Sequence, residues 1–166
     1  PNLCHTNNLV PFIIVDPDLK HPTDVTLRRA GTLADVAPTA LQRMGRTKPE
    51  LMTGHSLLQD GYADHPARKV LLVVLDGGGL GKRDQTNPIF LADTPVWDRL
   101  ITKFPFASLA ASGSAVGLIE RKAGNSEAGQ QTIGAGRTVL QDDARIELAL
   151  EDGSFFKNPV LTLHNL

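Results

Sequence analysis

The sequence predicts an α/β fold with a mostly parallel sheet and flanking helices. Two short apolar runs, Val10 to Val15 and Val70 to Leu75, have the composition of buried strands, and the second run is typical of a strand covered on both faces. Segments with helix caps and stops follow at residues 31–45, 94–104 and 142–153. Strands that alternate with helices in this way indicate a parallel sheet.

The helix expected at residues 31–45 begins with Thr32 or Asp35 as its cap and ends at Gly45. In the second half, Thr94 is the expected N-cap of a helix with Pro95 at its first position. A second strand of this half is expected within residues 106–113.

The last helix is expected to begin at a cap formed by Asp142 or Asp143. It is expected to end near Gly153, because glycine is the usual residue just past a helix. Between the two halves, residues 59–69 have the Gly- and Pro-containing polar composition of a linker.

Composition narrows the classes of function. The chain has 166 residues, a formal net charge of −1 and 41% hydrophobic residues, which suffice for a globular core. The near-neutral charge and the lack of a basic stripe argue against nucleic-acid binding. No apolar run approaches the length of a membrane span, and no secretory signal is visible, so no membrane partner is expected. The single cysteine, Cys4, excludes an internal disulfide framework and fits a reducing compartment.

Asp76 ends the second apolar run and precedes three glycines, Gly77 to Gly79. Ligands of open α/β sheets bind beyond the carboxyl ends of strands, and glycines let the backbone approach a ligand closely. The glycines match neither the phosphate-loop nor the dinucleotide-binding pattern. Asp76 is therefore interpreted either as a turn-capping residue or as an oxygen ligand of a divalent metal ion.

Ser126 lies in the stretch GNSEAG, residues 124–129. One interpretation is the cap of a helix that starts near Glu127, and the other is a nucleophile on a tight turn. The two are compatible, because a serine at a helix N-terminus would place a phosphate on free backbone N–H groups. His5 precedes the first strand and is either a structural histidine or a metal ligand.

Longer motifs point to one family. The second half contains VLLVVLDGGGLG, NPIFLADTPVWDRL, GNSEAG, IGAGRTVLQD and EDGSFFKNPVL, and the first half contains CHTNNLVPFIIVD, GTLADVAPTALQRMG and MTGHSLL. The first set resembles the amino-terminal part of the cofactor-independent (2,3-bisphosphoglycerate-independent) phosphoglycerate mutases of the alkaline phosphatase superfamily. The second set resembles the carboxyl-terminal end of the same family.

The resemblance implies that the family's tail precedes its head in this chain and that the middle is missing. Residues 1–58 then come from the carboxyl-terminal end, residues 59–69 form the linker and residues 70–166 come from the amino-terminal end. Together they would form one domain, a partial alkaline-phosphatase-like metal domain. Such a join is physically sensible, because head and tail share one domain in the family.

The resemblance also assigns roles to residues. Asp76 corresponds to a metal ligand, Ser126 to the serine that is phosphorylated during turnover and also contacts metal, and His5 to a ligand of a second metal ion. Asn125, next to the serine, is expected to position the phosphate. The implied cofactors are two Mn²⁺ ions, or Mg²⁺ or Co²⁺, which activate the serine and neutralise phosphoryl charge.

The implied function is the interconversion of 3-phosphoglycerate and 2-phosphoglycerate in cytoplasmic glycolysis, through phosphoserine. Because the family's other ligands lie in the missing middle, the metal site is expected to be incomplete in this chain. The expected partners are phosphoglycerate and either complementary missing segments or a second copy of the chain. The alternatives are an inactive binding or scaffold module that keeps part of the metal site, and a residual metal-dependent phosphomonoesterase.

Overall fold

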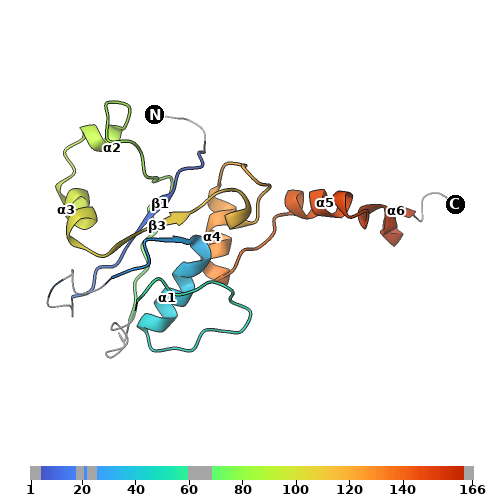
Figure 1. Ribbon diagram of the computed structural model, residues 1–166, viewed down its shortest axis with the longest axis horizontal. Coiled ribbons are helices and arrows are strands. Elements are labelled where there is room, and N and C mark those ends of the chain that lie inside the picture. The colour runs from blue at the N-terminus through green and yellow to red at the C-terminus, as the bar shows by residue number, and fades with distance from the viewer. Residues whose placement is uncertain (1–4, 18–20, 22–25, 60–68, 163–166) are drawn as a thin grey trace.

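The computed structural model describes residues 5–17, 21, 26–59 and 69–162, and a three-stranded sheet lies at its centre (Figure 1). The strands are β1 (Val10–Ile13), β2 (Ala30–Thr32) and β3 (Phe106–Ala110). The α-helices are α1 (Val36–Arg43), α2 (Pro88–Leu91), α3 (Pro95–Lys103), α4 (Ser126–Ala135), α5 (Asp142–Glu151) and α6 (Pro159–Thr162). Three short 3₁₀ helices are η2 (Leu33–Asp35), η3 (Gly113–Val116) and η4 (Phe155–Lys157).

Strand β3 lies in the middle of the sheet. It pairs antiparallel with β1, where Val10 lies opposite Leu109, and parallel with β2, where Ala30 lies opposite Ser108. The α/β class is therefore confirmed, with a mixed sheet in place of the mostly parallel one that was predicted. Both neighbours of β3 come from the first 58 residues, so the two predicted segments build one sheet. Residues 60–68 of the predicted linker lie outside the described residues.

The core lies where β3 meets the helices α1 and α4 (Figure 1). Ala107 and Leu109 are buried while their neighbours along β3 are half-buried, which is the alternation expected of a strand with one covered face. The buried apolar residues that form the core cluster are Leu27, Leu33, Val36, Leu57, Leu58, Ala107, Leu109, Val116, Leu118 and Ala128.

The predicted helix at residues 31–45 is divided into three elements. Gly31 and Thr32 belong to β2, and a 3₁₀ turn precedes α1. Strand β2 was not predicted, because its three residues carry no strand pattern and become a strand only through pairing with β3. The predicted stop is confirmed, since Gly45 has a φ of +63° just past α1.

A buried carboxylate, that of Asp35, holds this region together. Its Oδ2 accepts a hydrogen bond from the backbone N–H of Thr32 at 2.9 Å, and its Oδ1 accepts one from the N–H of His55 at 2.8 Å. The Arg28 guanidinium lies 3.2 Å from Oδ2. Asp35 thus links the start of α1 to the stretches of chain around Arg28 and His55.

Thr39, one turn along α1, extends this polar network into the core. Its hydroxyl donates to the backbone oxygen of Asp35 at 2.6 Å and accepts from the backbone N–H of Leu57 at 2.9 Å. Leu57 itself is fully buried. The hydroxyl therefore satisfies a buried N–H that has left regular secondary structure.

The predicted buried strand at residues 70–75 is wrong. These residues form no strand, and their side chains are between 41% and 86% exposed. Apolar residues favour burial. A strand covered on both faces, however, needs a neighbouring strand at each edge and a layer of helices on each face of its sheet. The described part of the chain supplies none of them at this position.

Helix α3 begins after Thr94 with Pro95 at its first position, as predicted. The predicted cap of α5 is wrong, because Gln141 precedes the helix and Asp142 and Asp143 lie in its first turn. The N–H of Gln141 donates to the carbonyl oxygen of Gly117 at 2.8 Å, which fixes Gln141 as the flanking residue. The two aspartates still lie where the helix dipole favours negative charge.

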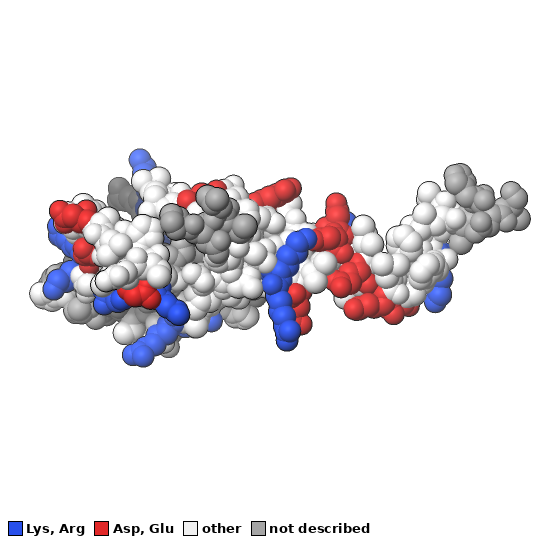
Figure 2. Space-filling model, turned by 90° about the horizontal axis from the view of Figure 1, so that it is seen from above, with Lys and Arg blue, Asp and Glu red and all other residues white. Residues whose placement is uncertain are grey.

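Helices α5 and α6 with η4 form an arm, residues 142–162, that projects from the body (Figure 1). Figure 2 shows acidic residues gathered on this arm around α5, whereas both signs of charge are mixed over the body. Several apolar side chains of the arm are exposed, among them Ile146, Leu148 and Phe156. None of the described helices has the length and apolar character needed to cross a membrane.

Replacing threonine by valine is expected to change the stability in opposite directions at two buried positions, Thr132 and Thr39. The Oγ1 of Thr132 in α4 is buried and has no hydrogen-bond partner within the described residues. Thr132→Val keeps the shape and removes this hydroxyl, so the free energy of unfolding should rise by about 1 kcal/mol. Thr39→Val removes a hydroxyl with two partners and should lower it by about 1–3 kcal/mol. Urea unfolding of both variants checks the pair, and shifts of the same sign would contradict it.

Two glycines form a second matched pair. At Gly117, φ is +76° and an added Cβ would lie 1.9 Å from the carbonyl oxygen of Val139. At Gly134, inside α4, an added Cβ would meet nothing within 4 Å. Gly117→Ala should therefore destabilise the fold by about 2 kcal/mol or more. Gly134→Ala should stabilise it by up to about 1 kcal/mol, because alanine is the better helix former. Thermal unfolding midpoints measure both effects.

Candidate active site

The aspartate at the end of the exposed apolar segment is held in a tight turn. Gly77 follows it with a φ of +79°, and the Gly77 N–H donates to Asp76 Oδ1 at 2.9 Å. Glycine adopts this left-handed conformation without the cost that a Cβ would bring. The turn directs the carboxylate of Asp76, which is exposed, toward the start of α4.

Asn125, and not Ser126, caps helix α4. The Asn125 Oδ1 accepts a hydrogen bond from the backbone N–H of Ala128 at 2.8 Å. Ser126 is the first residue of the helix, so the interpretation of Ser126 as the cap is wrong. Both residue types are good caps, and sequence alone did not separate them. Because Asn125 takes the capping role, the Ser126 hydroxyl is left for another partner.

That partner is Asp76, fifty residues earlier in the chain. Ser126 Oγ lies 2.9 Å from Asp76 Oδ1 and 2.8 Å from Oδ2. The structure therefore brings together two of the residues that the sequence singled out. Both side chains are exposed, which leaves the pair open to a ligand and also to water.

Backbone donors surround the serine. The N–H groups of Ser126 and Glu127 stand in the first turn of a ten-residue helix, and neither has an acceptor within the described residues. Free N–H groups and the positive end of the helix dipole favour a phosphate or another anion there. A phosphoryl group on the Ser126 oxygen would lie within reach of these donors.

Close backbone packing fixes the loop before the serine. A Cβ added to Gly124 would lie 2.0 Å from the carbonyl oxygen of Ala111, so only glycine fits there. Arg121 has a φ of +65°, which is unusual for a residue with a side chain. Lys122 pairs with Asp143 of α5, and this hydrogen bond from the ammonium group lowers the pKa of the Asp143 carboxyl.

The segment that carries His5 is tied to both loops of the pair. Asn7 Nδ2 donates to the carbonyl oxygen of Arg121 at 3.2 Å, and the Leu80 N–H donates to the carbonyl oxygen of Leu9 at 2.8 Å. His5 itself is exposed and forms no hydrogen bond or ion pair within the described residues. The structure thus joins Asp76 and Ser126, and within the described residues His5 forms no hydrogen bond or ion pair with either of them.

The oxygen atoms of Asp76 and Ser126 are of a type that binds divalent metal ions, but they are too few to complete a metal site. Carboxylate and hydroxyl oxygens are ligands that hard divalent cations accept. Over the described ranges, no group of three or more His, Cys, Asp or Glu residues could hold a metal ion. An octahedral ion needs about six ligands, so these residues do not complete a site for two ions.

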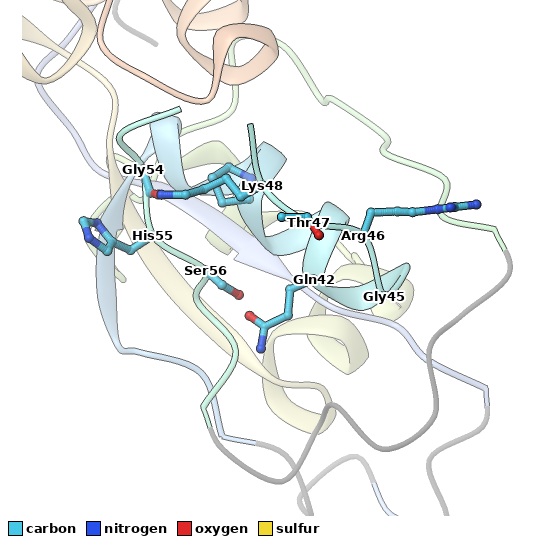
Figure 3. Close-up of a pocket in the computed structure, with 9 residues that line it drawn as sticks. Gln42, Gly45, Arg46, Thr47, Lys48, Gly54, His55 and Ser56 are labelled. Carbon is cyan, nitrogen blue, oxygen red and sulfur yellow. The ribbon is translucent and has the colours of Figure 1, made fainter. Parts of the chain in front are cut away.

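A separate hollow of about 550 Å³ lies beside the end of α1, and sequence reasoning did not foresee it (Figure 3). None of the predicted site residues lines it. Lys48 reaches across to the carbonyl oxygen of Gly54, with its Nζ at 2.9 Å, while the side chains of Arg46 and His55 point away from the middle. Its cationic groups do not converge on one point, so the hollow is a weaker candidate for a phosphate site than the Asp76–Ser126 pair.

Comparisons with known proteins find relatives that share one name. The chain is 47% identical over 95 residues to a 2,3-bisphosphoglycerate-independent phosphoglycerate mutase of Pseudomonas putida, with 57% of this chain and 19% of the relative covered. It is 51% identical over 96 residues to the enzyme of that name from Myxococcus xanthus, with 58% and 19% covered. A relative from Methanosarcina acetivorans is 48% identical over 94 residues, with 57% and 18% covered.

The chain spans about a fifth of the length of these curated relatives. No solved structure matches it. A family model described as the metalloenzyme superfamily matches residues 3–48 and 68–159, which is most of the chain and includes Asp76 and Ser126. The chain therefore belongs to the metalloenzyme superfamily.

Proposed function

We propose that this chain is part of a metal-dependent phosphoryl-transfer domain of the phosphoglycerate mutase type, with Ser126 as the nucleophile. The observation that carries the proposal is the Ser126 hydroxyl held within 2.9 Å of both Asp76 oxygens at the N-terminus of α4. The names of the relatives supply the substrate class, a phosphoglycerate.

The reaction follows from what each group can do. Ser126 Oγ attacks the phosphorus of 3-phosphoglycerate and its proton passes to water, while the Asp76 carboxylate orients the serine oxygen. The bond from phosphorus to the 3-hydroxyl oxygen breaks as the new bond to Oγ forms, and the leaving oxygen takes a proton from water. The N–H groups of Ser126 and Glu127 stabilise the phosphoryl charge.

The second half of the reaction runs the other way. The 2-hydroxyl oxygen of the bound glycerate attacks the phosphorus of phosphoserine and loses its proton to water. The bond from phosphorus to Ser126 Oγ breaks as the bond to the 2-oxygen forms, and Oγ takes a proton from water. The phosphoryl group thus leaves the serine as part of 2-phosphoglycerate, so atoms and charge balance over the cycle. Asn125 orients the serine by capping the helix, and we propose that its amide N–H₂ also contacts the phosphoryl group.

A divalent ion, which we propose to be Mn²⁺, would be held by Asp76 and Ser126 and would supply Lewis-acid stabilisation of the phosphoryl oxygens. His5 is the proposed ligand of a second ion. Its segment is anchored to the loops on both sides of the pair through Asn7 and Leu9, which supports this role. The ligands that the described residues lack are proposed to come from complementary segments of the kind that the longer curated relatives contain.

The exposure of Ser126 and Asp76 favours a second activity for the chain by itself. Mutase turnover requires that glycerate stay bound while phosphoserine exists, and water must be kept out. An open site lets water attack phosphoserine, so the isolated chain would act as a slow phosphomonoesterase. The third candidate is an inactive binding module with part of the metal site. The mutase proposal also implies a role in glycolysis and a cytoplasmic location.

Metal binding gives the first test. Calorimetric titration of Mn²⁺ into the full chain should show two weak sites, one through Asp76 and one through His5, and Asp76→Ala should abolish the first because its carboxylate ligand is lost. Asp93→Ala, an exposed aspartate away from the pair, is the matched control and should bind as the unsubstituted chain does. His5→Ala should reduce the stoichiometry if His5 holds a second ion. An unchanged stoichiometry after Asp76→Ala would contradict the assignment of Asp76 as a metal ligand.

Covalent chemistry gives the second test. After incubation with 3-phosphoglycerate and Mn²⁺, mass spectrometry should find a phosphoryl group on Ser126, and Ser126→Ala should carry none. Ser114→Ala removes another exposed serine and should leave the phosphorylation unchanged. Release of inorganic phosphate would identify the phosphomonoesterase, and formation of 2-phosphoglycerate the mutase. Metal binding without any phosphoserine would support the inactive binding module.

A further inference from the structure

Asp76 and Gly77 form one of three Asp-Gly sequences in the chain, and the other two are at residues 60–61 and 152–153. In such a sequence, the backbone nitrogen of the glycine can attack the side-chain carboxyl carbon of the aspartate and close a succinimide ring. Glycine favours this reaction, because it has no Cβ to hinder the approach of its nitrogen. Residues 60–61 lie outside the described residues, so two of these sequences can be compared in the structure.

At Asp76, the nitrogen and the carboxylate already lie in contact. The Gly77 N–H donates to Asp76 Oδ1 at 2.9 Å and has no other acceptor within the described residues. Both residues are exposed, and a Cβ added to Gly77 would meet nothing within 4 Å, so the surroundings leave room for the ring. A rotation about the Cβ–Cγ bond turns the carboxyl carbon toward the nitrogen. Because the reacting groups are already close, ring closure costs little additional entropy.

The Asp-Gly sequence at residues 152–153 is arranged differently. The Gly153 N–H is directed to the carbonyl oxygen of Leu150 at 3.3 Å. Asp152 Oδ1 accepts its hydrogen bond from the N–H of the next residue, Ser154, at 2.8 Å. Hydrogen bonds from Ser154 lower the pKa of the Asp152 carboxyl. This carboxyl therefore stays ionised, and a carboxylate accepts a nucleophile less readily than the neutral acid does.

Asp143 shows that the hydrogen bond alone does not make a reactive position. The Ala144 N–H donates to Asp143 Oδ1 at 2.9 Å, as the Gly77 N–H does to Asp76. Ala144, however, is buried, carries a Cβ and lies inside α5, where the helix fixes its backbone dihedrals. The contact, the glycine and the exposed position therefore occur together at Asp76 and at neither of the other two aspartates.

We propose that Asp76 is a site of spontaneous isomerisation to isoaspartate in the folded chain. The Gly77 nitrogen forms a bond to Asp76 Cγ, and one carboxyl oxygen leaves as water with the amide proton and one proton from the solvent. Water then attacks the main-chain carbonyl carbon of Asp76, and the bond from that carbon to the Gly77 nitrogen breaks. The main chain now runs through Cγ, and the former carbonyl carbon becomes a carboxylate that returns one proton to the solvent. The product is an isomer of the original chain, so atoms and charge balance.

The isomerisation removes the contact between Asp76 and Ser126. The main chain gains one methylene at residue 76, and the carboxylate moves from the end of the side chain to Cα. The distances of 2.8 and 2.9 Å from the carboxylate to Ser126 Oγ are then lost. The reaction needs only water, so the inference does not depend on the proposed function.

Peptide mapping of aged protein tests the proposal. The full chain is incubated without metal, well below the onset of unfolding and in parallel in concentrated urea, and electron-transfer fragmentation locates isoaspartate. In urea, Asp76 and Asp152 should isomerise at rates within about twofold of each other, because the contacts that distinguish them are gone. In the folded chain, Asp76 should isomerise about fivefold faster or more, because only Asp152 is protected. Equal rates at the two positions in the folded chain would overturn the proposal.

Substitutions identify the attacking nitrogen. Asp76→Asn should form the same ring with loss of ammonia, about tenfold faster, because a neutral amide accepts a nucleophile more readily than a carboxylate. Gly77→Ala should slow the isomerisation about tenfold, since a Cβ hinders the nitrogen. Gly79→Ala is the matched control, because its added Cβ would lie 3.5 Å from the nearest atom, an ordinary contact. A rate that Gly77→Ala leaves unchanged, or that Gly79→Ala lowers equally, would contradict attack by Gly77.

Discussion

Strand β3 must satisfy its backbone hydrogen bonds along both edges, and strands from the first 32 residues do this. The antiparallel bonds to β1 and the parallel bonds to β2 close the sheet around a strand whose paired residues lie 93 to 99 residues after those of β1 and 78 after those of β2. This long-range pairing is slow to form, because loop closure must precede any gain in contact energy. Once it exists, Ala107 and Leu109 face α1 and α4, and the rest of the core assembles on them.

The pairing of β1 with β3 also helps to position Asp76 and Ser126. The residues just before β1 contact two loops. Asn7 bonds the loop before Ser126, and Leu9 bonds the loop after Asp76. Asn125 then caps α4 and releases the serine to Asp76. The serine–aspartate contact is thus a product of sheet order and helix capping, and neither residue is held by burial.

The predictable part of the structure rests on local signals. Pro95 after Thr94, Gly45 at the end of α1 and the alternation in β3 need only nearby residues to take effect. Strand β2 escaped prediction, because residues 30–32 are extended only through their partner. The segment 70–75 was predicted to be buried, because an apolar run reports what a residue prefers and not which neighbours are present.

The site, like the fold, was predictable only where local signals decide the outcome. Asp76 and Ser126 stood out through resemblance to a family, and the structure places them in hydrogen-bond contact. Asn125 and Ser126 are equally good caps, so geometry alone decided between them. His5 carries no local signal beyond its residue type. The close approach of Gly124 to the carbonyl oxygen of Ala111 depends on how two loops pack, which composition does not encode.

The projecting arm changes how the molecule should lose its structure. Helix α5 is tied to the body near its start, by Gln141 to Gly117 and by Lys122 to Asp143, and its apolar residues beyond that point already face water. Melting of the arm exposes little new apolar surface, so it carries a small heat-capacity change and is scarcely coupled to the core. Unfolding is then not a single cooperative step. Helical signal is lost from the arm before the sheet gives way.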